Sequence, residues 1–124
     1  MSGANDDLSN ATLSSLQLVS GAGPTGLPAY AAAVDLGAAR VVLAAVSFSQ
    51  KWVLGAVLGT ATAVIYVPAD VLPAGARPDK GALLVAALDE DPAGALTYEL
   101  TYVRPWAMDG ISYFECFGMV PAAS

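Results

Sequence analysis

The sequence predicts an all-β protein: a small β-barrel or sandwich with a long inserted loop. We expect a flexible, polar N-terminal arm at residues 1–13 and a single barrel domain at 14–124. Three observations support this fold class. Short segments rich in β-branched and aromatic residues recur along the chain, Gly- and Pro-rich stretches separate them, and the last two segments show two-residue periodicity.

The first predicted elements follow the arm. Residues 15–20 (SLQLVS) alternate between apolar and polar side chains, which indicates a short strand. Residues 40–48 are rich in valine, which favours a second strand. Between them, the alanines of residues 30–37 favour a helix but Gly37 interrupts it, so that segment stays open between helix and strand.

The middle of the chain contains the predicted long loop. Residues 49–59 include two glycines and a lysine, so we expect a movable loop there. Residues 61–67 are apolar and β-branched, which predicts a buried strand that stops at Pro68. Residues 68–81 hold three prolines and two glycines, which a helix or a central strand would not tolerate.

The final third contains three predicted strands. Residues 82–88 form an apolar run that ends in the turn 89–94 (DEDPAG). Residues 96–103 (LTYELTYV) alternate with a period of two. Residues 104–110 (RPWAMDG) are predicted to turn the chain, and residues 111–119 (ISYFECFGM) return as the last strand.

The last two strands are predicted to differ in how they are covered. In 96–103, Leu and Tyr share one face, while the other face holds Thr, Glu and Val. In 111–119, apolar groups occupy both faces, which suggests a barrel strand that also packs against something outside. In 96–103 the apolar face consists of Leu96, Tyr98, Leu100 and Tyr102. In 111–119 one face consists of Ile111, Tyr113, Glu115 and Phe117, and the opposite face includes Phe114 and Cys116.

The composition disfavours several classes of function. Five basic and eleven acidic residues give a formal charge of −6, so the chain should repel nucleic acid and anionic membranes. With no histidine, the usual general base and the commonest metal ligand are missing. Cys116 is the single cysteine, so no internal disulfide forms, and an inert packed thiol is expected rather than a nucleophile.

The surface is predicted to meet other protein chains. Hydrophobic residues make up 56% of the sequence and charged residues only 13%, too few to cover a small domain. The chargeless run from Trp52 to Ala69 is long enough for a bilayer, but its glycines, Pro68 and β-branched residues speak against a membrane helix. We therefore expect contacts between subunits and no membrane partner.

A G-x-G-x-x-G motif at residues 21–26 resembles the dinucleotide-binding fingerprint. The position where an acidic residue should hold a ribose is occupied by Leu43-Ala44-Ala45, and no further helical units follow. We read residues 21–28 as a Gly/Pro-rich loop and expect no cofactor.

Two groups of carboxylates are candidates for chemistry. Residues 89–91 (Asp-Glu-Asp) could bind a hard cation with help from Asp79 or Asp109, but consecutive carboxylates in a turn point apart, which favours a solvated turn. Glu99 and Glu115 could face each other like a glycosidase pair if the strand register allowed it. Paired edge charges are favoured, so we expect no metal and no enzymatic activity.

The two tryptophans are predicted to serve different contacts. Trp52 lies in the predicted loop beside Lys51, where an exposed aromatic side chain suits an interface. Trp106 is predicted to anchor the last hairpin against the barrel together with Arg104 and Pro105. The candidate interface and gating loop consists of Gln50, Lys51, Trp52, Val53, Leu54 and Gly55.

The second half of the chain carries a family resemblance. The motif Ala63–Asp70 (AVIYVPAD), the bend Pro78–Gly81 (PDKG) and the strand Tyr98–Pro105 (YELTYVRP) occur in the order typical of one group, and TGLPAY at 25–30 is similar to its early loop. In these motifs residues 61–119, about half the chain, resemble the small head–tail connector proteins of long-tailed bacteriophages. This is the head-completion or stopper group, often labelled minor capsid proteins.

The resemblance implies a structural role in a virion. It implies a β-barrel subunit that assembles in the host cytoplasm and forms a homo-oligomeric ring at the phage neck. Its neighbours would be a portal or adaptor protein and a tail terminator or tail tube protein. DNA would pass through the ring with non-specific contact only, held in until ejection. The alternatives are a capsid decoration protein and a tail terminator or adaptor subunit.

Overall fold

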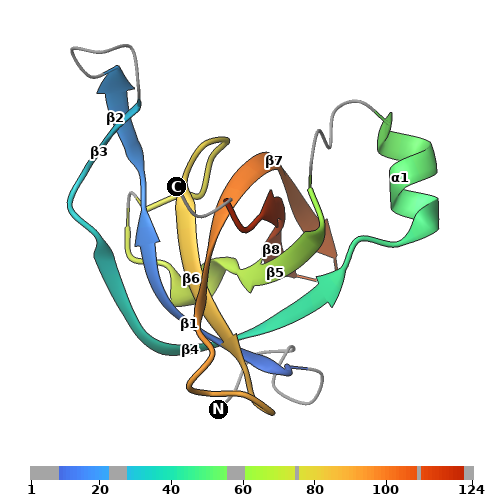
Figure 1. Ribbon diagram of the computed structural model, residues 1–124, viewed down its shortest axis with the longest axis horizontal. Coiled ribbons are helices and arrows are strands. Elements are labelled where there is room, and N and C mark those ends of the chain that lie inside the picture. Colours follow the sequence, from blue (N-terminus) through green and yellow to red (C-terminus); the bar gives the residue numbers. More distant parts are fainter. Residues whose placement is uncertain (1–8, 23–27, 56–60, 75, 109, 122–124) are drawn as a thin grey trace.

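A closed antiparallel barrel forms the centre of the computed structural model, which describes residues 9–22, 28–55, 61–74, 76–108 and 110–121 (Figure 1). In order around the barrel, the strands are β1 (Ala11–Gln17), β4 (Val34–Ala45), β5 (Ala63–Pro68), β8 (Ile111–Met119), β7 (Leu96–Met108) and β6 (Leu83–Leu88). β6 pairs with β1 and closes the ring of strands. The predicted all-β barrel is therefore confirmed.

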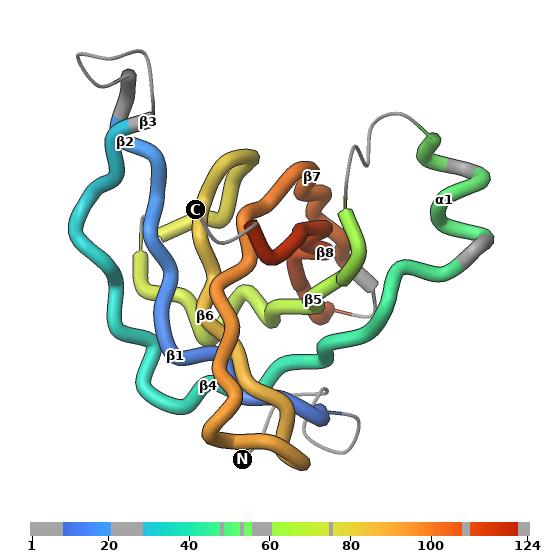
Figure 2. The backbone as a smooth tube through the Cα atoms, in the orientation of Figure 1, coloured from blue at the N-terminus to red at the C-terminus, as the bar shows by residue number. Residues whose placement is uncertain are grey.

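Two elements extend from this barrel. β2 (Val19–Ala22) and β3 (Pro28–Tyr30) pair as a two-stranded ribbon that continues beyond β1 and β4. The helix α1 (Phe48–Leu54) follows β4 and lies on the other side of the barrel from this ribbon (Figures 1 and 2). A 3-10 turn, η2 (Ala69–Val71), lies between β5 and the irregular segment that leads to β6.

The N-terminal strands begin earlier than the sequence predicted. β1 starts at Ala11, which pairs with Val41 of β4 on one side and Leu88 of β6 on the other. The predicted arm at 1–13 therefore extends at least three residues too far, and the barrel domain starts at or before residue 11 rather than at 14. Residues 1–8 lie outside the described part. The open segment 30–37 becomes strand from Val34, and Gly37 takes a φ of 65° within it.

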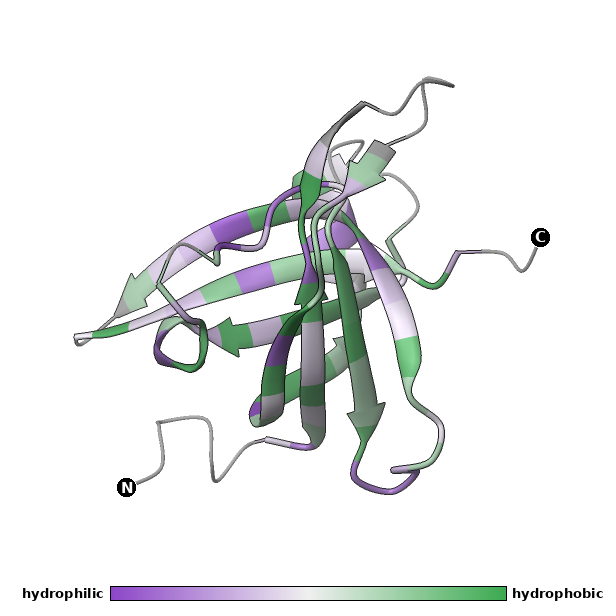
Figure 3. Cartoon of the chain, turned by 90° about the vertical axis from the view of Figure 1, so that its left-hand side faces the viewer, coloured by the Kyte–Doolittle hydropathy of each residue, from purple (hydrophilic) through white to green (hydrophobic). Residues whose placement is uncertain are grey.

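The barrel interior is filled by one apolar cluster. Buried residues alternate with less buried ones along β1 and β6, and hydrophobic residues run along the barrel strands, which Figure 3 colours by hydropathy. Because each strand sends every second side chain inward, all six strands contribute to this core. Its fully or almost fully buried members are Ala11, Leu13, Leu16, Val41, Leu43, Ile65, Val67, Ala82, Leu84, Ala86, Tyr98, Leu100 and Cys116.

The longest strand, β7, changes face part-way along. Tyr98 and Leu100 belong to the barrel core, but the register with β8 shifts between Leu100 and Tyr102. Beyond this bulge Val103 packs against the core, whereas Tyr102 packs against a cluster on the outer face. The prediction that Tyr102 shares a face with Tyr98 is therefore wrong, since one extra residue reverses the alternation.

The last strand, β8, is covered on both sides as predicted. Phe114 packs on the barrel core and Cys116 is part of it. On the opposite face Phe117 is fully buried and Glu115 is only 5% exposed. On this second covered face, outside the barrel, three of the predicted site residues, Gln50, Arg104 and Trp106, bond to Glu115.

Candidate functional site

The predicted mobile loop contains a helix instead. α1 begins after Ser47, whose Oγ accepts a hydrogen bond from the backbone N of Gln50 at 3.1 Å. In return, Gln50 Oε1 accepts from the backbone N of Ser47 at 2.8 Å, which completes a capping box. Gly55 ends the helix with a φ of 53°. The loop prediction for 49–59 is therefore wrong over residues 49–54, and residues 56–60 lie outside the described part.

The helix turns its residues in different directions. Gln50 and Leu54 are half-buried, and Leu54 packs on a cluster outside the barrel formed by Val46, Ala61, Val64 and Phe117. Lys51 is exposed, and Trp52 has 80% of its surface exposed. Of the six loop candidates, α1 thus uses two for attachment and presents two to solvent. The helix also includes Val53, whose side chain is not described.

A buried carboxylate holds the helix and the hairpin together. The Arg104 Nε donates a hydrogen bond to Glu115 Oε1, and Trp106 Nε1 donates to the same oxygen at 3.0 Å. Gln50 Nε2 donates to Glu115 Oε2 at 3.3 Å and also lies 3.2 Å from the Tyr66 hydroxyl oxygen. Glu115 therefore connects β7, β8 and α1, and Gln50 uses one end of its amide for capping and the other for attachment.

The predicted hairpin anchor lies within a strand rather than in a turn. Arg104, Pro105 and Trp106 belong to β7 and pair with Glu115, Phe114 and Tyr113 of β8. The predicted turn at 104–110 is therefore wrong up to residue 108, while Asp109 lies outside the described part and Gly110 turns with a φ of 77°.

Pro105 is tolerated because only β8 pairs with β7 at this point within the described residues, so one edge of β7 needs no N–H from it. A proline in the sequence therefore does not distinguish a turn from a strand that has an open edge.

Aromatic rings surround this carboxylate. The guanidinium carbon of Arg104 lies 5.0 Å from the ring centroid of Trp106 and 5.9 Å from that of Phe117. Tyr102 stacks on Phe117 with centroids 6.0 Å apart. Phe117 forms an apolar cluster outside the barrel with Val46, Ala61 and Val64, which we call the outer cluster, and Tyr102 packs against it.

Burial shifts the ionisation of two neighbouring groups. The pKa of the Tyr66 hydroxyl is raised by its burial and by the nearby Glu115 charge, although the hydrogen bond from Gln50 opposes this rise. Burial also raises the pKa of the Cys116 thiol, with the Glu115 charge adding to the effect. Both groups are therefore protonated at neutral pH, which suits a packing role.

The other candidate carboxylates are placed apart. Glu99 pairs with Met119 in the hairpin register, while Glu115 pairs with Arg104, so the two glutamates are not opposite each other. Asp89 receives hydrogen bonds from Arg40, whose Nη1 lies 2.7 Å from its Oδ1, and this guanidinium holds the pKa of Asp89 below its ordinary value. No cluster of three or more metal-ligating side chains occurs in the described part of the chain.

Two further predicted segments lie only partly within the described residues. Of the G-x-G-x-x-G motif, Gly21 and Ala22 form part of β2, and the rest, at 23–26, lies outside the described residues. Of the candidate span 52–69, residues 63–68 are strand β5. Among the described residues, the chain has no helix with the length and apolar character that crossing a membrane requires.

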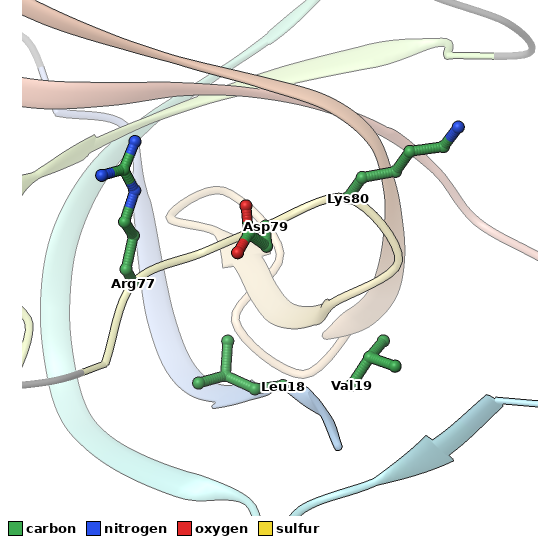
Figure 4. A pocket seen from close by; sticks show the side chains of 5 residues that line it. All are labelled: Leu18, Val19, Arg77, Asp79 and Lys80. Atoms are coloured by element: carbon green, nitrogen blue, oxygen red, sulfur yellow. The ribbon is translucent and has the colours of Figure 1, made fainter. Parts of the chain in front are cut away.

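An open depression lies on the other side of the barrel from α1. It has a volume of about 410 Å³ and is lined by Leu18, Val19, Arg77, Asp79 and Lys80. Figure 4 shows the three charged side chains on the segment that precedes β6, with the two apolar side chains facing them from the junction of β1 and β2. These five residues are not recognisable as a group from the sequence, because residues 18–19 and 77–80 are far apart along the chain.

No protein-family model, curated protein or solved structure matches this chain.

Proposed function

We propose that this chain is a structural subunit of a bacteriophage neck. Copies would form a ring that joins the DNA-filled head to the tail and gates the DNA channel. The proposal starts from the resemblance of residues 61–119 to head–tail connector proteins. It is supported by the barrel fold that this resemblance implied and by the way α1 is presented.

The observation that carries the proposal is the exposure of Trp52 on a fixed helix. Its side chain is 80% exposed, yet α1 is held by a capping box and by the bonds of Gln50 to Glu115 and Tyr66. A large aromatic side chain gains most from burial when its backbone is already ordered, because binding then costs little conformational entropy. Such residues are typical anchors of protein interfaces, where truncation costs about 2 kcal/mol or more.

The charge distribution suits a DNA conduit. The chain has a formal charge of −6, and two of its five basic residues are neutralised in ion pairs, Arg40 with Asp89 and Arg104 with Glu115. A channel that bound phosphates would slow DNA, since each phosphate contact adds to affinity. A subunit with eleven acidic and only five basic residues would let DNA pass without holding it.

The proposed function is tested by the mass and shape of the purified chain and by its place in the particle. Native mass spectrometry and negative-stain electron microscopy should show closed rings with a central opening. In phage particles, antibody labelling should mark one vertex. Labelling over the whole shell would favour a decoration protein, and a monomer at all concentrations would contradict the ring.

The gating role has its own test. Deletion of residues 50–58 should leave a folded barrel but give heads that lose DNA or fail to join tails. The matched control is a deletion within the turn 90–94, which lies away from α1. Normal joining by the 50–58 deletion would contradict the gate.

A further inference from the structure

We propose that α1 of one subunit inserts Trp52 into the depression of a second copy lined by Leu18, Val19, Arg77, Asp79 and Lys80. Copies would then join head to tail. This inference rests on the proposed ring and names the contact that would build it.

The inserting side is an exposed, positioned pair of residues. Trp52 and its neighbour Lys51 are both exposed on α1, with the indole 80% accessible. Because Gln50, the residue before them, is bonded to Glu115 and Tyr66, the start of α1 is held against the barrel. The helix therefore offers an aromatic ring beside a positive charge in a defined orientation.

The receiving side matches both groups. Leu18 and Val19 supply apolar surface, and Val19 is 38% exposed although it is a large hydrophobic residue. The guanidinium carbon of Arg77 lies 5.3 Å from the ring centroid of Phe114, and Arg77 is exposed, so a planar group that stacks well on aromatic rings is within reach of an incoming indole. Asp79 is exposed between Arg77 and Lys80 and can pair with an incoming ammonium group (Figure 4).

One pairing of opposite charges favours a second copy as the occupant, although Arg77 and Lys80 leave the lining of the depression with one more cation than anion. Neither Lys51 nor Asp79 forms an ion pair within the described residues, whereas Arg40 and Arg104 each do. A Lys51–Asp79 pair between copies would bring these two charges together next to the indole.

The depression is also large enough for a side chain. Its volume of about 410 Å³ lies in the range of about 300–1,000 Å³ that is typical of ligand-binding pockets.

The positions of the two surfaces favour a ring. α1 and the start of β2, which borders the depression, lie on opposite sides of the barrel (Figures 1 and 2). A contact between two different patches on opposite sides repeats from copy to copy, and it closes into a ring when the rotation allows. An isologous dimer would instead bring the same patch of two copies together.

Cysteine cross-linking distinguishes these arrangements. In a Cys116→Ala background, W52C and V19C chains are prepared separately and as a double variant, then mildly oxidised. On denaturing, non-reducing gels we expect the mixture of single variants to give one-to-one dimers and the double variant to give a ladder that ends at the ring size. Each single variant alone should form no disulfide-linked dimer. The matched control pairs W52C with D91C in the exposed turn after β6 and should give no cross-link.

The energetic contribution is tested by substitution. Trp52→Ala should weaken self-association at least tenfold in sedimentation experiments without changing thermal unfolding of the dissociated subunit. Ile111→Ala, which shortens another exposed hydrophobic side chain, should leave association unchanged. Lys51→Glu and Asp79→Lys should each weaken association, and the double variant should recover it.

The outcomes separate this contact from the function. Rings that form without the 52–19 cross-link, or a disulfide between two W52C chains, would overturn the contact and leave the ring standing. The expected cross-link in a protein that coats the whole shell would keep the contact and overturn the neck assignment. A strictly monomeric wild-type chain would overturn both.

Discussion

The two arginine–carboxylate pairs of this protein join the same chemical groups in different surroundings. Arg40 and Asp89 link β4 to the end of β6, with side chains 38% and 48% exposed. Arg104 and Glu115 link β7 to β8, with side chains 29% and 6% exposed. Water screens the first pair, whereas the second depends on protein partners for each oxygen of its carboxylate. How much an arginine–carboxylate pair contributes to stability therefore depends on its burial, since the two pairs consist of the same chemical groups.

The largest effect is expected at the buried pair. Glu115→Ala would leave Arg104, Trp106 and Gln50 without their shared acceptor, and we expect a loss of about 2–4 kcal/mol in the free energy of unfolding. Urea denaturation measures it. Glu99→Ala, in the facing strand of the same hairpin, is the matched control and should cost much less. Equal losses for the two variants would show that the hydrogen bonds to Glu115 add no stability to the folded protein.

An intermediate effect is expected at the attachment of α1. Gln50→Ala removes one side of the capping box and the donor to Glu115 and Tyr66, so we expect a loss of about 1–2 kcal/mol. Amide hydrogen exchange should speed up in α1 while β8 stays protected. Lys51→Ala, at the exposed neighbour, is the control. Unchanged exchange in α1 would show that Gln50 does not hold the helix.

The smallest effect is expected at the exposed pair. Asp89→Asn should barely shift the urea midpoint at neutral pH, and added salt should remove the remaining difference between the midpoints of the wild type and the variant. Because Arg40 lowers the pKa of Asp89, its contribution is present above the ordinary value of 3.8 and is lost as the pH falls through the lower folded pKa. The wild type and Asp89→Asn should therefore converge in acid, with Glu90→Gln as the control. A gap that widened in acid would contradict this sign.

The C-terminal strands could be predicted from the sequence because their pattern is local. The alternation in 111–119 correctly placed Phe114 and Cys116 on one face and Glu115 and Phe117 on the other. The bulge in β7 could not be predicted this way, since it depends on how the strand fits its partner and no local residue type marks it.

The site was only partly accessible to sequence reasoning. Gln50, Arg104 and Trp106 were singled out for other reasons, and the structure brings all three to one carboxylate. The glycines near 55 outweighed the Ser47-x-x-Gln50 capping signature, which was the signal that could have revealed α1. The depression opposite α1 joins residues 18–19 to residues 77–80, and only tertiary structure brings them together.

Closure of the barrel sets the order in which the chain can fold. The hydrogen bond from Ser14 Oγ to the carbonyl oxygen of Val85, between β1 and β6, joins positions 71 residues apart. During synthesis the first strand therefore waits for most of the polypeptide before it gains its second neighbour. Chains with many such distant pairings fold over roughly milliseconds to seconds rather than microseconds. Until then the edge of β1 stays open to wrong partners, so crowded expression should favour aggregation of unfinished chains.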